Sequence, residues 1–295
     1  MINFVSMNKK DTTQINKNTF KIPSYIIKTG KFLQFFSSKW ATKYVLKLFA
    51  TPPNYKTPDR EKMMRESAKK VKVAIPTLQK EVMVYEYGYS KQKVLLTHGW
   101  AGRGTQLYEI ADNILENRMM VISFDAPAHG LSDGKQTNLL EYIEAIKHLS
   151  KIYGPFEAVV GHSFGGIALL ATIAEQTITD KLVVIGIENS IPKIVDLFVE
   201  KLELKQKVAG LIKKEMERLF STNLVAISPM ETAKKVKIPT LVLHDTEDYD
   251  VAVSSAYKIR QNLEQGEILI TNGLGHRRIL RDKKVIQRII DFITE

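Results

Sequence analysis

EAVVGHSFGGIALLATIAEQT, residues 157–177, combines a short apolar run, a glycine-rich turn and a longer helical run. Within it Gly161, Ser163 and Gly165 form the pattern G-x-S-x-G at a strand-to-helix junction. A serine on such a tight turn has a strained backbone, so its neighbours must lack side chains. The turn also raises the hydroxyl above the carboxyl end of the strand. We therefore predict that Ser163 is a nucleophile, and that the Phe164 N–H at the helix N-terminus can bind an anion.

Apolar runs and helical patterns alternate on both sides of this stretch. Near-continuous apolar strands that alternate with helices indicate a mainly parallel sheet with helices on both faces. The predicted strands cover residues 71–75, 81–88, 93–98, 119–125, 157–163, 181–188, 240–245 and 267–271, and the helical patterns lie near 104–115, 137–152, 164–177, 252–264 and 282–294. Residues 190–235 contain helical patterns without a strand, so we predict an inserted cap there. The α/β domain is expected to span residues 71–295.

A serine hydroxyl needs a base to accept its proton. His276, in the loop GLGHRR after the last strand, is the only histidine that follows the acidic residues in the chain order Ser…Asp/Glu…His. Gly273 and Gly275 give this loop the freedom to reach back over the sheet. We therefore predict His276 as the base. Of the other histidines, we expect three to line the site: His98, His129 and His162. The remaining two are His148 and His244.

The base in turn needs a carboxylate that fixes its tautomer. The loop after the strand at 240–245 offers Asp245, Glu247, Asp248 and Asp250. Asp248 lies a few residues beyond the strand end, far enough to turn toward the His276 loop, so we predict it as the acid. Asp245 is the alternative.

A tetrahedral intermediate also needs hydrogen-bond donors for its oxyanion. The Phe164 N–H is one predicted donor. The second is expected from His98-Gly99-Trp100, directly after the strand at 93–98, with the Trp100 N–H as donor. Gly99 would let the backbone approach a substrate closely.

Composition narrows the chemistry and the partners. The 295 residues include no cysteine, which excludes a disulfide, a thiolate metal site and a cysteine nucleophile. The net charge of +11 is concentrated at the N-terminus, where residues 1–80 hold 17 Lys and Arg against 4 Asp and Glu. Such asymmetry can attract anionic lipid or nucleic acid, although a solvated basic face is the simpler interpretation. No apolar stretch could span a bilayer and no signal-peptide pattern is present, so we expect a cytoplasmic protein.

The first 70 residues form a separate basic extension. Residues 1–20 are polar and predict a loose tail. Apolar and aromatic residues at helical spacing predict an amphipathic helix over 24–50, which Pro52–Pro53 ends, and a shorter helix follows over 61–70. The helix at 24–50 is expected to pack against the catalytic domain, and the alternative is a weak contact with a membrane surface.

Five segments resemble the α/β-hydrolase superfamily in order and spacing: HGW (98–100), FDAPAHGLSDG (124–134), GHSFGG (161–166), HDTEDYDV (244–251) and GLGHRR (273–278). The resemblance covers residues 71–295 and implies an eight-stranded sheet with a cap after the sixth strand. It implies the triad Ser163–Asp248–His276, because the fourth motif usually reads HGxxD, and an oxyanion hole from Trp100 and Phe164. Two residues depart from the pattern: Asp245 and Ala128 stand where glycines are usual.

The resemblance implies an esterase-like acyl hydrolase that acts on a small-molecule substrate. It implies neither a metal nor an organic cofactor. The alternatives are a non-catalytic ligand-binding protein on the same fold and a peripheral-membrane lipid hydrolase anchored through residues 24–50. A nucleic-acid partner is not expected, since no recognition motif is found.

Overall fold

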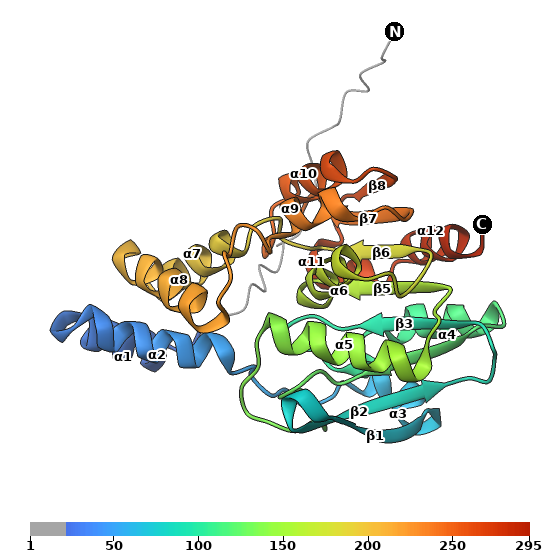
Figure 1. The fold of residues 1–295 in the computed structure, drawn as a ribbon, viewed down its shortest axis with the longest axis horizontal. Coiled ribbons are helices and arrows are strands. Elements are labelled where there is room, and N and C mark those ends of the chain that lie inside the picture. The colour runs from blue at the N-terminus through green and yellow to red at the C-terminus, as the bar shows by residue number, and fades with distance from the viewer. Residues whose placement is uncertain (1–21) are drawn as a thin grey trace, which may run out of the picture.

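The computed structural model describes residues 22–295, so the tail predicted for 1–20 lies outside the described residues. An eight-stranded sheet forms its centre, in the order β1-β2-β4-β3-β5-β6-β7-β8 (Figure 1). The strands β1 and β2 pair antiparallel, as do β2 and β4, and all other pairs are parallel. The bounds are β1 Lys69–Ile75, β2 Lys80–Tyr87, β3 Lys93–Thr97, β4 Met120–Phe124, β5 Ala158–His162, β6 Leu182–Ile185, β7 Thr240–Asp245 and β8 Gly266–Thr271. The predicted mostly parallel sheet is confirmed.

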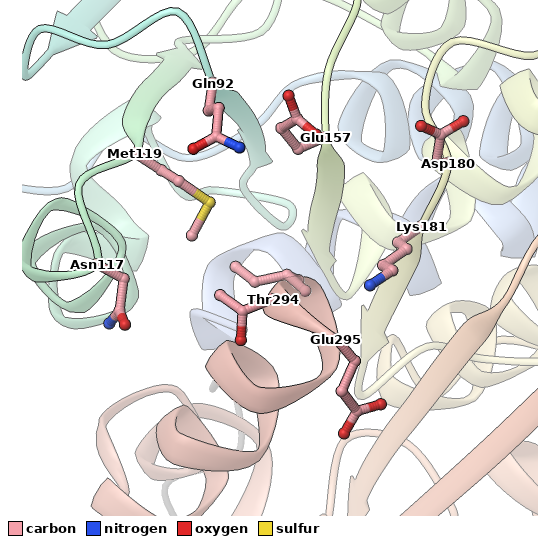
Figure 2. Close-up of a pocket in the computed structure, with 9 residues that line it drawn as sticks. Gln92, Asn117, Met119, Glu157, Asp180, Lys181, Thr294 and Glu295 are labelled. Atoms are coloured by element: carbon pink, nitrogen blue, oxygen red, sulfur yellow. The ribbon is translucent and has the colours of Figure 1, made fainter.

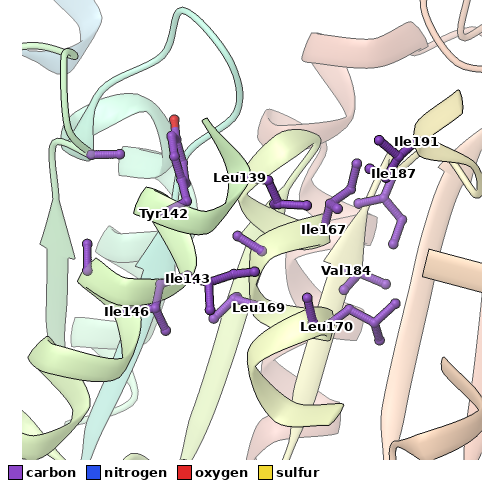
Figure 3. Close-up of a cluster of buried hydrophobic side chains, with 14 of the residues drawn as sticks. Leu139, Tyr142, Ile143, Ile146, Ile167, Leu169, Leu170, Val184, Ile187 and Ile191 are labelled. Atoms are coloured by element: carbon purple, nitrogen blue, oxygen red, sulfur yellow. The ribbon is translucent and has the colours of Figure 1, made fainter. Parts of the chain in front are cut away.

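Helices cover both faces of the sheet because strand residues alternate between two apolar clusters. On β3, Leu95 joins one cluster, while Val94 and Leu96 join the other. The first cluster includes residues of α5, α6 and α10, and Figure 3 shows how α5 and α6 direct apolar side chains toward each other. The second includes residues of α3, α4 and α12. The bounds are α3 Lys62–Ser67, α4 Tyr108–Glu116, α5 Leu139–Tyr153, α6 Phe164–Glu175, α10 Ser254–Asn262, α11 Gly275–Arg278 and α12 Lys283–Thr294.

The cap follows β6 and contains α7 (Ile191–Lys201) and α8 (Gln206–Phe220), whereas α9 (Pro229–Thr232), which lies within the residues predicted for the cap, contacts α6 and α10 instead. The N-terminal helices α1 (Ser24–Phe36) and α2 (Ser38–Ala50) lie beside α7 and α8 at one end of the molecule (Figure 1). The Phe49 and Phe198 rings meet edge to face with centroids 5.3 Å apart. A Cβ on Gly30 would lie 3.5 Å from Leu204. The extension therefore packs mainly on the cap.

Two predicted boundaries of the extension differ from the structure. The helix expected over 24–50 is two helices, because Ser37 is extended (φ −158°, ψ 123°) and caps α2 by accepting a hydrogen bond from the Lys39 N–H. The helix expected over 61–70 ends at Ser67, and Lys69 and Lys70 belong to β1, which pairs them with Glu86 and Tyr85. As expected, α2 ends before Pro52–Pro53. Among residues 22–295, no helix is sufficiently long and apolar to cross a membrane.

Candidate active site

Ser163 lies on a sharp turn between β5 and α6. Its φ of 51° and ψ of −122° are strained for a residue with a side chain. The Ser163 N–H donates to the Ile185 carbonyl, and its carbonyl accepts from the Ile167 N–H, so both backbone groups are held. Such strain persists only where the surroundings impose it. The sequence therefore builds a serine that is displayed at the carboxyl end of the sheet.

The glycines around Ser163 are required by lack of space. A Cβ on Gly165 would lie 2.4 Å from the His98 carbonyl oxygen, and one on Gly161 would lie 2.6 Å from the Gly166 Cα. Both obstacles are backbone atoms that cannot move aside. The turn can therefore form only because Gly161 and Gly165 have no side chain.

The structure brings Ser163, His276 and Asp248 together in series. The His276 Nε2 lies 3.1 Å from the Ser163 Oγ, and the His276 Nδ1 lies 2.7 Å from the Asp248 Oδ2. If Nδ1 carries the proton and donates to the carboxylate, Nε2 is free to accept the serine proton. This arrangement has the contacts of a nucleophile, a base and an orienting acid.

Backbone amides and a second histidine surround the Asp248 carboxylate. Its Oδ1 accepts hydrogen bonds from the Asp250 and Val251 N–H groups, at 2.9 and 2.8 Å. The His244 Nε2 donates to the Val251 carbonyl at 2.9 Å and lies 3.5 Å from the Asp248 Oδ2. The Asp248 side chain is buried. One carboxylate oxygen is thus fixed by the loop, and the other faces His276.

Asp245 holds the start of α11, because His276 lies in this short helix and not in a loop as the sequence predicted. Its carboxylate accepts from the Gly275 N–H at 2.8 Å, the Leu274 N–H at 3.0 Å and the Thr271 hydroxyl at 2.6 Å. Burial raises the pKa of Asp245, but these hydrogen bonds and one from the Glu247 N–H outweigh that effect and lower it below the ordinary value. Asp245 does not contact His276 through its carboxylate in this arrangement, so the structure favours Asp248 as the acid.

The segment that follows β3 approaches the serine from the other side. A Cβ on Gly99 would lie 2.9 Å from the Ser163 Cβ, and the Trp100 and Phe164 ring centroids are 5.3 Å apart. Phe164 is the first residue of α6, so its N–H has no partner within that helix. Within the described chain, neither the Trp100 nor the Phe164 N–H donates to a protein acceptor.

His98 and His129 support this segment as buried, neutral rings. The His98 Nδ1 donates to the Gly99 carbonyl at 2.8 Å, and the His98 Nε2 accepts from the Ala126 N–H at 3.0 Å. The His129 Nδ1 lies 3.0 Å from the Pro127 carbonyl, and its Nε2 accepts from the Ala101 N–H. Burial lowers the pKa of His129 to about 4 and that of His98 well below its ordinary value. Of the three histidines predicted to line the site, these two are 1% and 4% exposed, which is why burial dominates the pKa of each.

His162 contacts the base directly, which sequence reasoning did not find. Its Nε2 donates to the His276 backbone carbonyl at 2.9 Å, and the two ring centroids are 4.7 Å apart. Burial, followed by the charge of His276, lowers the pKa of His162 well below its ordinary value. Its position directly before Ser163 is the only sequence signal for this contact. The neutral ring positions His276 against the nucleophile.

Ala128, the second departure from the family pattern, has a left-handed backbone with φ of 63°. Its N–H donates to the Asp133 carbonyl at 2.8 Å, which closes the loop over 128–133. Glycine adopts this conformation without strain, whereas alanine does so at a cost of about 1 kcal/mol.

Two surface hollows lie at the opposite end of the sheet. One, of about 410 Å³, lies beside Met119, Glu157 and Lys181, which come directly before β4, β5 and β6 (Figure 2). The other, of about 460 Å³, includes Phe156 and Thr179. Ligands of open α/β sheets bind at the carboxyl ends of the strands, where Ser163 lies, so neither hollow is part of the candidate site.

In residues 22–295, no group of three or more metal-ligating side chains is found.

Comparison with known proteins agrees with this geometry. The model of the alpha/beta hydrolase family matches residues 94–288. Similar solved structures include an esterase from Pyrococcus furiosus (18% identity, 83% of this chain, 96% of that chain, TM-score 0.63) and an esterase from Exiguobacterium antarcticum (15%, 77%, 100%, 0.62). A membrane phospholipase A, described as a bacterial virulence factor, is also similar (16%, 92%, 96%, 0.62). No curated protein sequence gave a significant match. The family match spans about two thirds of the chain, which therefore belongs to the alpha/beta hydrolase family.

Proposed function

We propose that the protein is a serine hydrolase that cleaves a carboxylic ester or related acyl bond through an acyl-enzyme. The observation that carries this proposal is the series of contacts Ser163 Oγ–His276 Nε2 at 3.1 Å and His276 Nδ1–Asp248 Oδ2 at 2.7 Å. Ser163 is the nucleophile, His276 the general base and acid, and Asp248 the carboxylate that stabilises the imidazolium.

Acylation begins when the Ser163 Oγ attacks the carbonyl carbon while the His276 Nε2 accepts the hydroxyl proton. The carbonyl oxygen becomes an oxyanion, for which the Trp100 and Phe164 N–H groups are the proposed donors. As the tetrahedral intermediate collapses, the ester C–O bond breaks. The leaving alcohol takes the proton from His276, and the acyl group stays on Ser163.

Deacylation repeats these roles with water as the nucleophile. His276 accepts a proton from water, whose oxygen attacks the acyl carbon. The intermediate expels the Ser163 oxygen, which recovers its proton from His276, and the carboxylic acid leaves. Apart from the ester and one water molecule, every group used in these steps is a side chain or backbone amide of the chain.

The substrate class is proposed from the neighbouring structures. Two of them are named as esterases, which favours a carboxylic ester. The phospholipase A covers 92% of this chain, whereas residues 71–295 make up only about three quarters of it. That likeness of fold therefore includes part of the N-terminal extension, and it favours a lipid ester within the class. Initial rates on esters of graded acyl length, and on a thioester and an amide, would define the preference.

The assignment of Ser163 is tested by the Ser163→Ala variant. Turnover of p-nitrophenyl esters is expected to fall by at least about 10⁴-fold, since no nucleophile remains. Labelling by a fluorophosphonate probe is expected to disappear, while the thermal unfolding temperature is retained. Ser67→Ala, at an exposed serine that ends α3, is the matched control. Undiminished turnover by Ser163→Ala would reject the nucleophile, and a native protein that neither turns over esters nor takes the label would favour a ligand-binding role.

A further inference from the structure

The helices α1 and α2 carry five exposed aromatic residues, three of which form a cluster of rings. Phe32, Phe35 and Phe36 are 64%, 84% and 60% exposed, and Phe36 contacts both of the others with centroid distances of 5.0 and 5.3 Å. Tyr25 and Trp40 are 69% and 58% exposed on the same pair of helices. We call these five residues the aromatic face. A cluster of exposed rings on two consecutive helices differs from the single exposed apolar residues that are normal for a surface, and it indicates an interaction site.

The opposite side of the same helices is already occupied. Ala41 and Val45 are fully buried, and they belong to the apolar cluster that includes the cap. Gly30 faces Leu204, and the Lys205 N–H donates to the Gln34 side chain at 2.7 Å. Packing on the cap therefore explains one side of the pair, and it leaves the aromatic face toward solvent.

Lysines accompany the aromatic face without acidic residues in the same segment. Between Asp11 and Asp59 the chain contains eight lysines and neither Asp nor Glu. Lys28, Lys39 and Lys43 are exposed on α1 and α2. Two of the lysines have acidic neighbours on the cap. Lys31 pairs with Glu203 of the loop between α7 and α8. Lys43 lies near enough to Glu215 of α8 to add to the effect of Arg218, which lowers the pKa of that carboxyl. Charge complementarity thus points to an anionic partner.

We propose that the aromatic face docks on the surface of a membrane that contains anionic phospholipid. Aromatic rings are favoured at the boundary between acyl chains and head groups, and lysine stems can extend so that their ammonium groups reach the phosphates. The helices would lie in the plane of the interface. The combination of exposed rings and exposed lysines fits this surface better than it fits an acidic protein, which would pair the lysines but leave the rings without an apolar partner.

This placement sets the cap beside the membrane. The helices α1, α2, α7 and α8 form one group at the end of the molecule toward which the strands β3, β5 and β6 run (Figure 1). A docked aromatic face would therefore hold the cap, and not the amino ends of the strands, close to the lipid. The inference concerns binding alone and does not depend on catalysis by Ser163.

The test measures sedimentation of the full chain, carrying Ser163→Ala to prevent lipid hydrolysis, with vesicles. Binding is expected to vesicles of equal parts phosphatidylcholine and phosphatidylserine, to weaken with salt, and to be far weaker to phosphatidylcholine alone. Phe35→Ser/Phe36→Ser is expected to weaken binding by at least about tenfold. Lys28→Gln/Lys39→Gln/Lys43→Gln is expected to weaken it by about fivefold per lysine.

Matched variants lie on other surfaces. Tyr89→Ser/Tyr257→Ser removes two exposed rings, and Lys151→Gln/Lys258→Gln/Lys283→Gln removes three exposed charges. Both are expected to bind like the parent chain. All variants are compared by thermal unfolding temperature, and, with Ser163 restored, by turnover of a soluble ester.

Three results would overturn the proposal. The first is that the parent chain does not bind the anionic vesicles. The second is that the test and control variants bind them equally. The third is that the chain does not bind vesicles but forms a dimer in analytical sedimentation, which Phe35→Ser/Phe36→Ser dissociates. The last result would assign the aromatic face to a second copy of this chain. Loss of ester turnover in Ser163→Ala with retained vesicle binding separates this test from that of the proposed function.

Discussion

The turn that carries Ser163 and the short helix α11 that carries His276 bring the two side chains to 3.1 Å from each other, but the two segments are held differently. Around Ser163, glycines allow backbone to meet backbone, and steric exclusion leaves no alternative. Around His276, the Asp245 carboxylate and the His162 ring hold the segment through hydrogen bonds. Steric positioning tolerates no added atom, whereas positioning by hydrogen bonds tolerates shape changes but depends on charge and protonation. The two halves of the proposed site should therefore fail under different perturbations.

Exchange of a carboxylate for an amide should have the largest effect, and it should differ between Asp248 and Asp245. Asp248→Asn retains an oxygen for the Asp250 and Val251 N–H groups, but it removes the charge beside His276 and favours the wrong tautomer. We expect kcat for ester hydrolysis to fall by about 10⁴-fold with little change in stability.

Asp245→Asn acts only through the position of α11, so a loss of about tenfold to a hundredfold in kcat is expected, together with a lower unfolding temperature. Steady-state kinetics and thermal unfolding of the two variants make the comparison. A greater loss of kcat at Asp245 than at Asp248 would transfer the role of the acid to Asp245.

An added methyl group should separate the steric half of the site from the rest of the chain. Gly165→Ala places a Cβ 2.4 Å from the His98 carbonyl oxygen and 2.7 Å from the Thr97 carbonyl oxygen. We expect the free energy of unfolding to fall by about 3 kcal/mol, measured by chemical denaturation. Gly210→Ala is the control, because nothing lies within 4 Å of its Cβ in α8, and it should stabilise by about 0.5–1 kcal/mol. Equal effects would contradict the steric account.

Acid should weaken the parts that depend on neutral histidines. The pKa of His129 is lowered by burial from 6.5 to about 4, so the unfolded chain binds a proton on this side chain at a higher pH than the folded chain does. The free energy of unfolding should therefore be highest above pH 6.5 and decrease as the pH falls toward 4. This residue should contribute up to about 3 kcal/mol of the decrease. Denaturant titrations of His129→Gln, carried out across this pH range, should show a shallower pH dependence than those of the parent chain.

The smallest effect concerns the left-handed residue in the loop beside the site. Ala128→Gly removes the strain at φ 63°, but it raises the entropy of the unfolded chain. We expect a net gain of up to about 0.5 kcal/mol in the free energy of unfolding. Ala174→Gly within α6 should instead cost about 1 kcal/mol. Destabilisation by Ala128→Gly would show that the Ala128 methyl group makes contacts that outweigh its backbone strain.

The difference between steric and hydrogen-bonded positioning also explains what could be predicted from the sequence. The Ser163 turn is local, so glycine spacing and the flanking apolar runs predicted both the strand and the helix around it. The strands of the sheet could be predicted for the same reason, because a buried parallel strand is a short apolar run that can be recognised locally. The position of His276 rested on chain order, which the fold of the family makes informative.

Features that depend on distant contacts could not be predicted. The hydrogen bond from His162 to the His276 carbonyl joins residues 114 positions apart, and no local pattern encodes it. The sequence left Asp245 and Asp248 as alternatives because their distinct partners, the loop amides and the His276 ring, appear only in three dimensions. The break at Ser37 was missed because the apolar spacing continues across it, while the capping hydrogen bond that interrupts the helix is made by a single side chain.

The contact between α2 and α8 has a consequence for biosynthesis. A ribosome completes α1 and α2 170 residues before it completes α8, the helix on which α2 rests, because α2 ends at Ala50 and α8 at Phe220. During that interval Ala41 and Val45 have no cap to cover them, so both sides of the α1–α2 pair expose apolar residues to solvent. The contact between α2 and α8 can therefore form only after both helices have left the ribosomal exit tunnel, and chaperones could bind the exposed apolar residues before then.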